Sequence, residues 1–218
     1  MNDVARTQTL ATHNMATLFR STVVFCLVLV LISCAGGNAK QTFNENTVVK
    51  AAKYFDIDSN VERDFDNALS LIQKKDYKQA ISVLTSVIDR EQRLPAPFIN
   101  MAIAQNKLGD TKSAESNLIK ALQLDLSHPV ANNELGLLYR KSGKFKAARI
   151  AYENAIKEYP AYLPVKRNLG VLCDLYMHDF ECALEQFEDY LAYKPDDKTV
   201  AIWLADVKRR LGSRLGSK

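Results

Sequence analysis

Residues 135–160 read LGLLYRKSGKFKAARIAYENAIKEYP, and the spacing inside this stretch decides the fold. Gly136 precedes Ala148 by twelve residues, Tyr152 comes four residues after that alanine, and Pro160 closes the stretch. Small and large apolar residues at this spacing predict two antiparallel helices that cross closely, with the proline ending the second helix. Gly143 lies between them, at a helix end where a left-handed backbone favours glycine.

The same pattern recurs four times with a period of 34 or 35 residues, which is the signature of a repeat protein. In each unit a small residue on the first helix precedes an alanine on the second. The four pairs are Ala68 with Ala80, Ala102 with Ala114, Gly136 with Ala148, and Gly170 with Ala183. We expect each small residue to face its alanine where the helices cross, because a larger side chain would overpack that contact. The fourth unit has one extra residue within 176–180, which predicts a longer or bent turn.

This arrangement resembles the tetratricopeptide repeat over about residues 61–197. The resemblance implies an all-α, right-handed solenoid of four helix pairs, which occupy residues 61–94, 95–128, 129–162 and 163–197. A solenoid needs a helix to cover its last apolar face, and the amphipathic residues 198–211 suit that role. We expect a short extra helix over 49–60 and a disordered tail over 212–218.

The first 34 residues are typical of a secretion signal. Residues 22–32 carry no charge and follow Arg20. As a helix they would measure about 16 Å, which is too short to span a bilayer but is the length of a signal-peptide core. We therefore predict a signal peptide over 1–33, with Met15 as a candidate for the true start.

The end of this segment, Ser33 followed by Cys34, resembles the bacterial lipoprotein signal. The resemblance implies a lipid on Cys34, and the alternative is an ordinary secretory cleavage that happens to lie near a cysteine. Two or three acyl chains hold a protein on a membrane stably. Ala35 stands where an aspartate would mark inner-membrane retention, so the resemblance implies the outer membrane, facing the periplasm. Residues 34–48 are polar and predict a flexible tether.

Composition and motifs argue against several functions. The net charge of +4 is too small, and too evenly spread, to indicate nucleic-acid binding. Three histidines and four scattered cysteines predict no metal site, and no motif predicts a cofactor or a small-molecule substrate. His128 and His178 lie in expected turns, far from any nucleophile motif. We therefore expect a protein that is not an enzyme.

Cys173 and Cys182 are the two cysteines that would stay unmodified in a mature lipoprotein. They fall on the two helices of the fourth unit near the turn, and the periplasm is oxidising, so a disulfide is one prediction. In the alternative, Cys173 lies in the core and Cys182 on the flank, with diverging side chains.

The resemblance also implies a groove lined by the first helix of each unit. Carried onto this chain, its lining positions in the last three units are Ile99, Ile103, Asn106, Lys107, Asn133, Leu137, Arg140, Lys141, Arg167, Val171 and Asp174. An apolar strip edged by Asn, Lys and Arg suits a peptide with some acidic character. In the alternative, several of these apolar residues pack between units and the cations are only solvated.

These features together predict a non-catalytic adaptor that binds a peptide or protein partner in the cell envelope. The chain resembles the pilotins of type IV pili and of related secretion or Tad systems, although those pilotins carry more repeats. It also resembles lipoproteins that scaffold peptidoglycan hydrolases. An enzyme framed on the repeats and a structural element that oligomerises through its ends are the two other classes.

Overall fold

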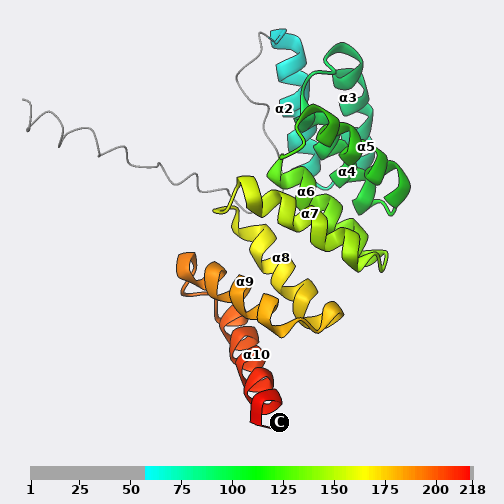
Figure 1. Ribbon diagram of the computed structural model, residues 1–218. Helices are drawn as coiled ribbons and strands as arrows, with labels where there is room; N and C mark the ends of the chain where they lie inside the picture. Colours follow the sequence, from blue (N-terminus) through cyan, green and yellow to red (C-terminus); the bar gives the residue numbers. More distant parts are fainter. Residues whose placement is uncertain (1–56, 217–218) are drawn as a thin grey trace, which may run out of the picture. The chain divides into compact units, whose positions relative to one another are not determined.

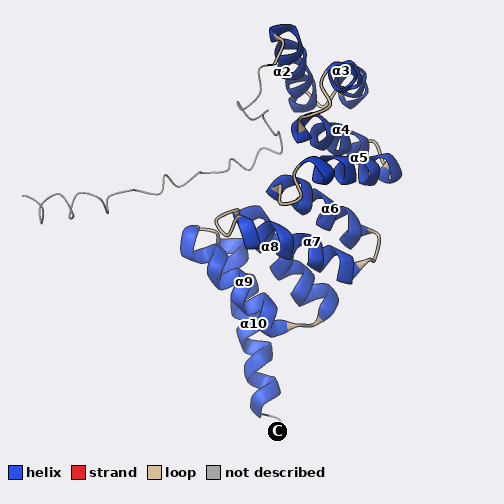
Figure 2. Ribbon diagram, turned by 45° about the horizontal axis from the view of Figure 1, so that its top comes forward, coloured by secondary structure: helices blue, strands red, loops and turns tan. Residues whose placement is uncertain are grey.

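The computed structural model describes residues 57–216, and within that range it contains helices and turns only (Figures 1 and 2). The helices are α2 (Ser59–Gln73), α3 (Tyr77–Arg90), α4 (Pro95–Lys107), α5 (Thr111–Leu124), α6 (Pro129–Lys141), α7 (Phe145–Glu158), α8 (Leu163–Leu172) with the π-helical turn η1 (Cys173–Met177), α9 (Phe180–Tyr193) and α10 (Lys198–Gly216). The signal peptide, Cys34 and the tether lie outside the described residues. So does the predicted helix 49–60 up to residue 56, and Asp58 then caps α2 instead of continuing a helix.

Local sequence accounts for most of the helix starts. Asp58, Asp76, Asp110 and Asp179 each accept a hydrogen bond from a backbone N–H in the first turn of α2, α3, α5 and α9. Each aspartate satisfies a donor that would otherwise have no partner, and its charge suits the positive end of the helix dipole. Pro95 and Pro129 are the first residues of α4 and α6, where a proline costs no hydrogen bond.

The predicted all-α repeat architecture is confirmed. Consecutive helices pack as pairs (α2 with α3, α4 with α5, α6 with α7, α8 with α9), and each second helix also packs on the next first helix. The core therefore runs from pair to pair, and α10 packs on α9 at its end. Among the described helices, none is both long enough and apolar enough to cross a membrane.

The small residues of the repeat are buried as expected, and an aromatic ring lies closest to each of the two glycines. A Cβ built on Gly136 would lie 2.6 Å from Cδ1 of Tyr152, and one on Gly170 would lie 2.6 Å from Cδ1 of Phe187. The glycines thus make room for a buried aromatic ring four residues after the alanine, and the atoms nearest that Cβ do not belong to Ala148. The remaining packing residues, Ala68, Ala80, Ala102, Ala114, Ala148 and Ala183, are almost completely buried.

The turns between paired helices contain a residue with a left-handed backbone. Gly143 (φ 73°) takes this position in the third pair, as the sequence predicts, and Gly109 (φ 88°) takes it in the second. In the first and fourth pairs it is taken by Lys75 (φ 64°) and His178 (φ 54°). A residue with a Cβ is strained there by roughly 1–2 kcal/mol.

Lys75→Gly should raise the free energy of unfolding by about 0.5 kcal/mol. The relief of left-handed strain exceeds the extra entropy that glycine loses on folding. Lys74 is the matched control, because it is also exposed but has a right-handed backbone (φ −75°), so Lys74→Gly should lower stability. Urea denaturation of both variants checks this, and equal effects of the two changes would contradict it.

The extra residue of the fourth pair is absorbed mainly in the helix. α8 passes into η1, and the Asp179 N–H then donates to the Cys173 carbonyl at 2.9 Å. A π-helical turn is the usual form of a one-residue insertion in an α-helix. The extra residue therefore widens the last helical turn, whereas the sequence predicted a longer or bent loop between the two helices.

The last helix is longer than the sequence pattern predicts, so the expected disordered tail over 212–218 is wrong for residues 212–216. Val200 and Val207 are fully buried in the core of the last pair, as expected of a capping helix. Beyond residue 211, the Ser213 hydroxyl donates to the Arg210 carbonyl, and the Arg214 guanidinium lies 5.4 Å from the centre of the Phe180 ring. These contacts extend the helix past the end of its apolar stripe.

Candidate functional site

The predicted groove positions lie on the first helices α4, α6 and α8, but they differ greatly in exposure. Ile99, Ile103 and Asn133 are buried, whereas Lys107 and Lys141 are exposed. Asn106, Leu137, Arg140, Arg167 and Val171 are partly exposed. The apolar groove positions that are accessible at the surface are therefore Leu137 of α6 and Val171 of α8.

One hydrogen bond joins the inner helices α6 and α8. The Asn168 side-chain amide donates to Asn133 Oδ1 at 2.8 Å, and the two helices pack against each other. Leu137 and Val171 lie one turn further along their helices. The bond therefore aligns these two predicted groove positions on α6 and α8. Asn168 is not among the predicted groove residues, because a lone asparagine in the sequence does not reveal a partner in the next unit.

Glu134 is a buried carboxyl on the same helix and was also missed. It is only 7% exposed, and it accepts a long hydrogen bond, at 3.4 Å, from the Asn133 side-chain amide. Burial raises the pKa of this carboxyl to about 7, against the opposing effect of the charges on Lys107 and Lys141. From the sequence alone, a glutamate beside Leu135 in a helix is expected to be exposed to solvent. The sequence therefore did not indicate that Glu134 is buried.

Two tyrosine hydroxyls are buried in the electric field of Glu134. Desolvation is the main cause that raises the pKa of Tyr152 and of Tyr162, and the Glu134 charge adds to the effect. The Tyr152 hydroxyl has no hydrogen-bond partner within the described part of the chain. This part of the solenoid therefore holds polar groups that the packing alone does not explain.

Asp174 does not line the groove as predicted. It is buried and forms an ion pair with Arg210 of α10. The register of the π-helical turn η1 differs from that of a regular helix, so positions carried over from the repeat pattern no longer apply there. Asp174 thus fixes the capping helix and is unavailable to a partner.

An aromatic and cationic surface lies where the third and fourth pairs meet. The rings of Phe145 and Tyr176 are 5.0 Å apart, and the Arg140 guanidinium lies 5.8 Å from the centre of the Tyr176 ring. Leu175 beside them is 58% exposed. Tyr176 belongs to the inserted segment, whose irregular spacing was the only sequence signal for it.

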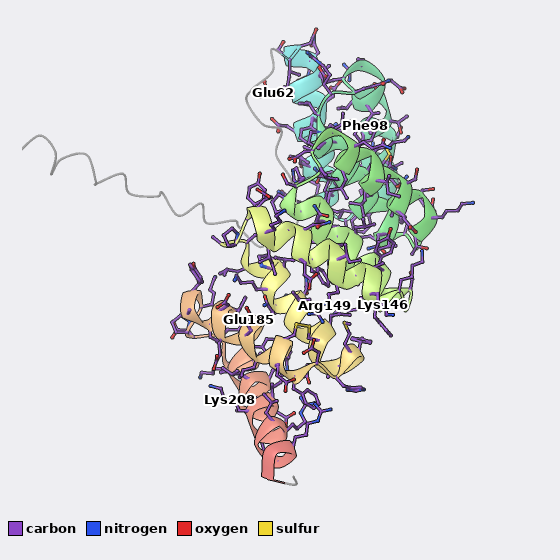
Figure 3. All side chains as sticks on the ribbon, in the orientation of Figure 1. Glu62, Phe98, Lys146, Arg149, Glu185 and Lys208 are labelled. Atoms are coloured by element: carbon purple, nitrogen blue, oxygen red, sulfur yellow. A yellow bond between two sulfur atoms is a disulfide. The ribbon has the colours of Figure 1, made fainter. Side chains whose placement is uncertain are left out.

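Cys173 and Cys182 form a disulfide in the structure, with their Cα atoms 5.9 Å apart. The Asp179 carboxylate lies close to both sulfur atoms, so the three residues form a cluster of metal-ligand type. However, bonded sulfurs are not thiolates, and the Asp179 oxygens accept hydrogen bonds from Arg149 Nη1 (2.7 Å) and from the Cys182 backbone (3.1 Å). Arg149, which Figure 3 labels, belongs to α7 and pairs with Asp179 at the start of α9. The cluster is therefore a structural link between η1 and α9.

Reduction of this disulfide should lower the free energy of unfolding by about 2 kcal/mol, because the bond closes a short loop in the unfolded chain. The Cys173→Ala/Cys182→Ala variant should unfold at the same lower urea concentration with or without reductant. Alkylation followed by mass spectrometry checks the bond itself, and two freely alkylated thiols in protein taken from an oxidising compartment would contradict it.

Comparison with known proteins identifies the architecture. Residues 129–162 match the family described as tetratricopeptide repeat. Among solved structures, MamA (residue 41 to the end) from Desulfovibrio magneticus RS-1 is 21% identical with a TM-score of 0.62, and the match covers 71% of this chain and 87% of that one. PilF of Pseudomonas aeruginosa is 21% identical with a TM-score of 0.64, over 71% and 70% of the two chains. The first repeat domain of Spaghetti (RPAP3), bound to the HSP90 peptide SRMEEVD, is 22% identical with a TM-score of 0.51, over 54% and 94%. At these identities the likeness shows the fold alone.

Proposed function

We propose that this chain, whose described part is a tetratricopeptide-repeat solenoid, is a non-catalytic adaptor that binds a protein or peptide partner on the inner face of its first helices. One observation carries the proposal: the Asn168–Asn133 bond places two inner helices side by side, with partly exposed Leu137 and Val171 flanked by Arg140 and Arg167. Apolar side chains gain affinity by burial, and guanidinium groups pair with carboxylates. The partner segment is therefore apolar with acidic residues.

The fold of the similar structures supports this choice of class. Repeat solenoids present extended surfaces to other proteins, and one of the similar structures, RPAP3, is bound to a peptide that contains two glutamates and an aspartate. That peptide is a ligand of RPAP3. For this chain it supports only the general idea that such a solenoid accepts an acidic segment.

We further propose that the adaptor is a lipoprotein of the outer membrane, held through Cys34 and facing the periplasm. The support is the sequence alone, namely the apolar core at 22–32 and the Ser33–Cys34–Ala35 junction. Labelling with a palmitate analogue should mark the wild-type protein and spare Cys34→Ala. A labelled Cys34→Ala protein would contradict the assignment of that residue.

The pathway we propose is assembly of a pilus or secretion component, and the alternative is a scaffold for peptidoglycan hydrolases. The support for the first reading is the sequence resemblance to pilotins, because the likeness to PilF, at 21% identity, concerns the fold alone. The experiment is photocrosslinking in cells from Arg140→p-benzoylphenylalanine, with Ile150→p-benzoylphenylalanine on the exposed face of α7 as the matched control. Capture of a secretin or pilus component from Arg140 alone supports pilus or secretion assembly, and capture of a hydrolase supports the alternative. Equal capture from Ile150, or none from Arg140, overturns the groove as a binding site.

A further inference from the structure

The inner helix α4 is buried on all sides. Nine consecutive residues, from Ala96 to Ala104, are buried, and they include the groove positions Ile99 (0% exposed) and Ile103 (4% exposed). The inner helix of a solenoid normally leaves its groove side to solvent. A helix that is apolar and buried all round needs a cover on every side.

Within residues 57–216, the helices packed against α4 are those expected at the back and flanks of an inner solenoid helix. They are α3 and α5, which are second helices, and α2 and α6, which are the first helices on its two flanks. At the predicted groove positions, burial also decreases from helix to helix: Ile99 and Ile103 are buried, Leu137 and Val171 are partly exposed, and Leu175 is exposed. The covered part is thus the one nearest to Ile57, where the described chain begins.

The chain segment that precedes Ile57 has the composition and the reach to provide this cover. Residues 46–56 read NTVVKAAKYFD, with apolar residues Val48, Val49, Tyr54 and Phe55. Ile57 packs against the core of the first pair, so the segment starts at the solenoid surface. Eleven extended residues span about 36 Å, whereas two steps between neighbouring helices, from α2 to α6, amount to about 20 Å.

Charge favours the same occupant. Glu134 lies at the far end of the covered part and has no close cation in the described part of the chain, since Lys107 and Lys141 act on it only at a distance. The segment carries Lys50 and Lys53. A lysine placed near Glu134 would offset the cost of burying that carboxyl.

We propose that residues 46–56 bind in cis across the inner face of α4 and the first half of α6, and so cover the half of the groove nearest to them. A tethered segment has an effective concentration in the millimolar range, so even weak binding fills the site. Insofar as the proposed function holds, a partner that needs this half must displace the segment. A partner confined to α6 and α8 need not.

Crosslinking in the purified full chain tests the proposal. Asn106→p-benzoylphenylalanine places the probe at the partly exposed end of α4, and Ile150→p-benzoylphenylalanine is the control on α7. We expect the Asn106 probe to link to a peptide containing residues 46–56, and the Ile150 probe not to do so. The additional change Val49→Asp/Phe55→Asp should reduce that product at least fivefold, whereas Phe43→Asp, outside the segment, should leave it unchanged.

Mixing isotope-labelled and unlabelled chains separates the remaining outcomes. Products within one chain support binding in cis, whereas products that join labelled to unlabelled chains show that a second copy fills the groove and overturn the proposal. A probe at Asn106 that reaches no peptide from 46–56 also overturns it. The proposed function is tested separately by capture from Arg140 in cells, so either idea can fail without the other.

Discussion

Gly136→Ala should destabilise the protein by about 2 kcal/mol, although alanine is the better helix former. The new Cβ would lie within 2.6 Å of Cδ1 of Tyr152, far inside van der Waals contact. The Tyr152 ring is fully buried, so a displaced ring would have to push against the surrounding core. Overpacking of this kind costs about 1–3 kcal/mol or more, which exceeds the gain of about 1 kcal/mol in helix propensity.

The chain itself supplies the compensating change. The third and fourth pairs combine Gly136 with Tyr152 and Gly170 with Phe187. The first two units instead carry alanine with leucine at these positions, namely Ala68 with Leu84 and Ala102 with Leu118. Gly136→Ala/Tyr152→Leu copies the pairing of the first two units into the third. We expect the double variant to recover most of the stability lost by Gly136→Ala.

Urea denaturation of the single and double variants measures this coupling. Gly212→Ala is the control, because Gly212 lies in α10 and a Cβ there meets nothing within 4 Å. That change should be neutral or slightly stabilising. A Gly136→Ala protein as stable as the wild type, or a double variant less stable than the single one, would show that the ring does not set the size of residue 136.

These pairs also show what the sequence could predict and what it could not. The period of 34 residues predicted which positions are small and buried, because the same close crossing recurs in every unit. It did not predict that the Tyr152 ring supplies the three atoms nearest to a Cβ at residue 136. Spacing along the chain indicates which helix face a residue shares, but the direction of a long side chain depends on the neighbouring helix.

The candidate site was predicted less completely for a related reason. Positions carried over from the repeat pattern hold as long as each helix keeps its register, and they fail at Asp174, where η1 widens the last turn. Glu134 and Asn168 gain their importance from neighbours on other helices, which one sequence does not reveal. The longer α10 likewise depends on a contact between Arg214 and Phe180.

The second large effect concerns pH and the buried carboxyl of Glu134. Its pKa in the folded protein is about 7, above the ordinary value of 4.5. Between these two values the folded state keeps a proton that the unfolded state has released, so the free energy of unfolding falls as the pH rises. Above about pH 7 both states are ionised and the destabilisation is complete. Glu134→Gln removes the titrating group but keeps its size.

The gain in the free energy of unfolding from Glu134→Gln, relative to the wild type, should therefore be about 2.5 kcal/mol larger at pH 8 than at pH 5. The hydrogen bond from Asn133 favours the ionised carboxyl, and this effect is already part of the raised pKa from which the difference is calculated. Glu185→Gln, on the exposed face of α9 (Figure 3), should show no such pH dependence. Urea denaturation of the three proteins at both pH values measures the effect. The same benefit of Glu134→Gln at pH 5 and pH 8 would mean that the carboxyl titrates normally, because water reaches it or because a cation such as Lys50 or Lys53 lies beside it.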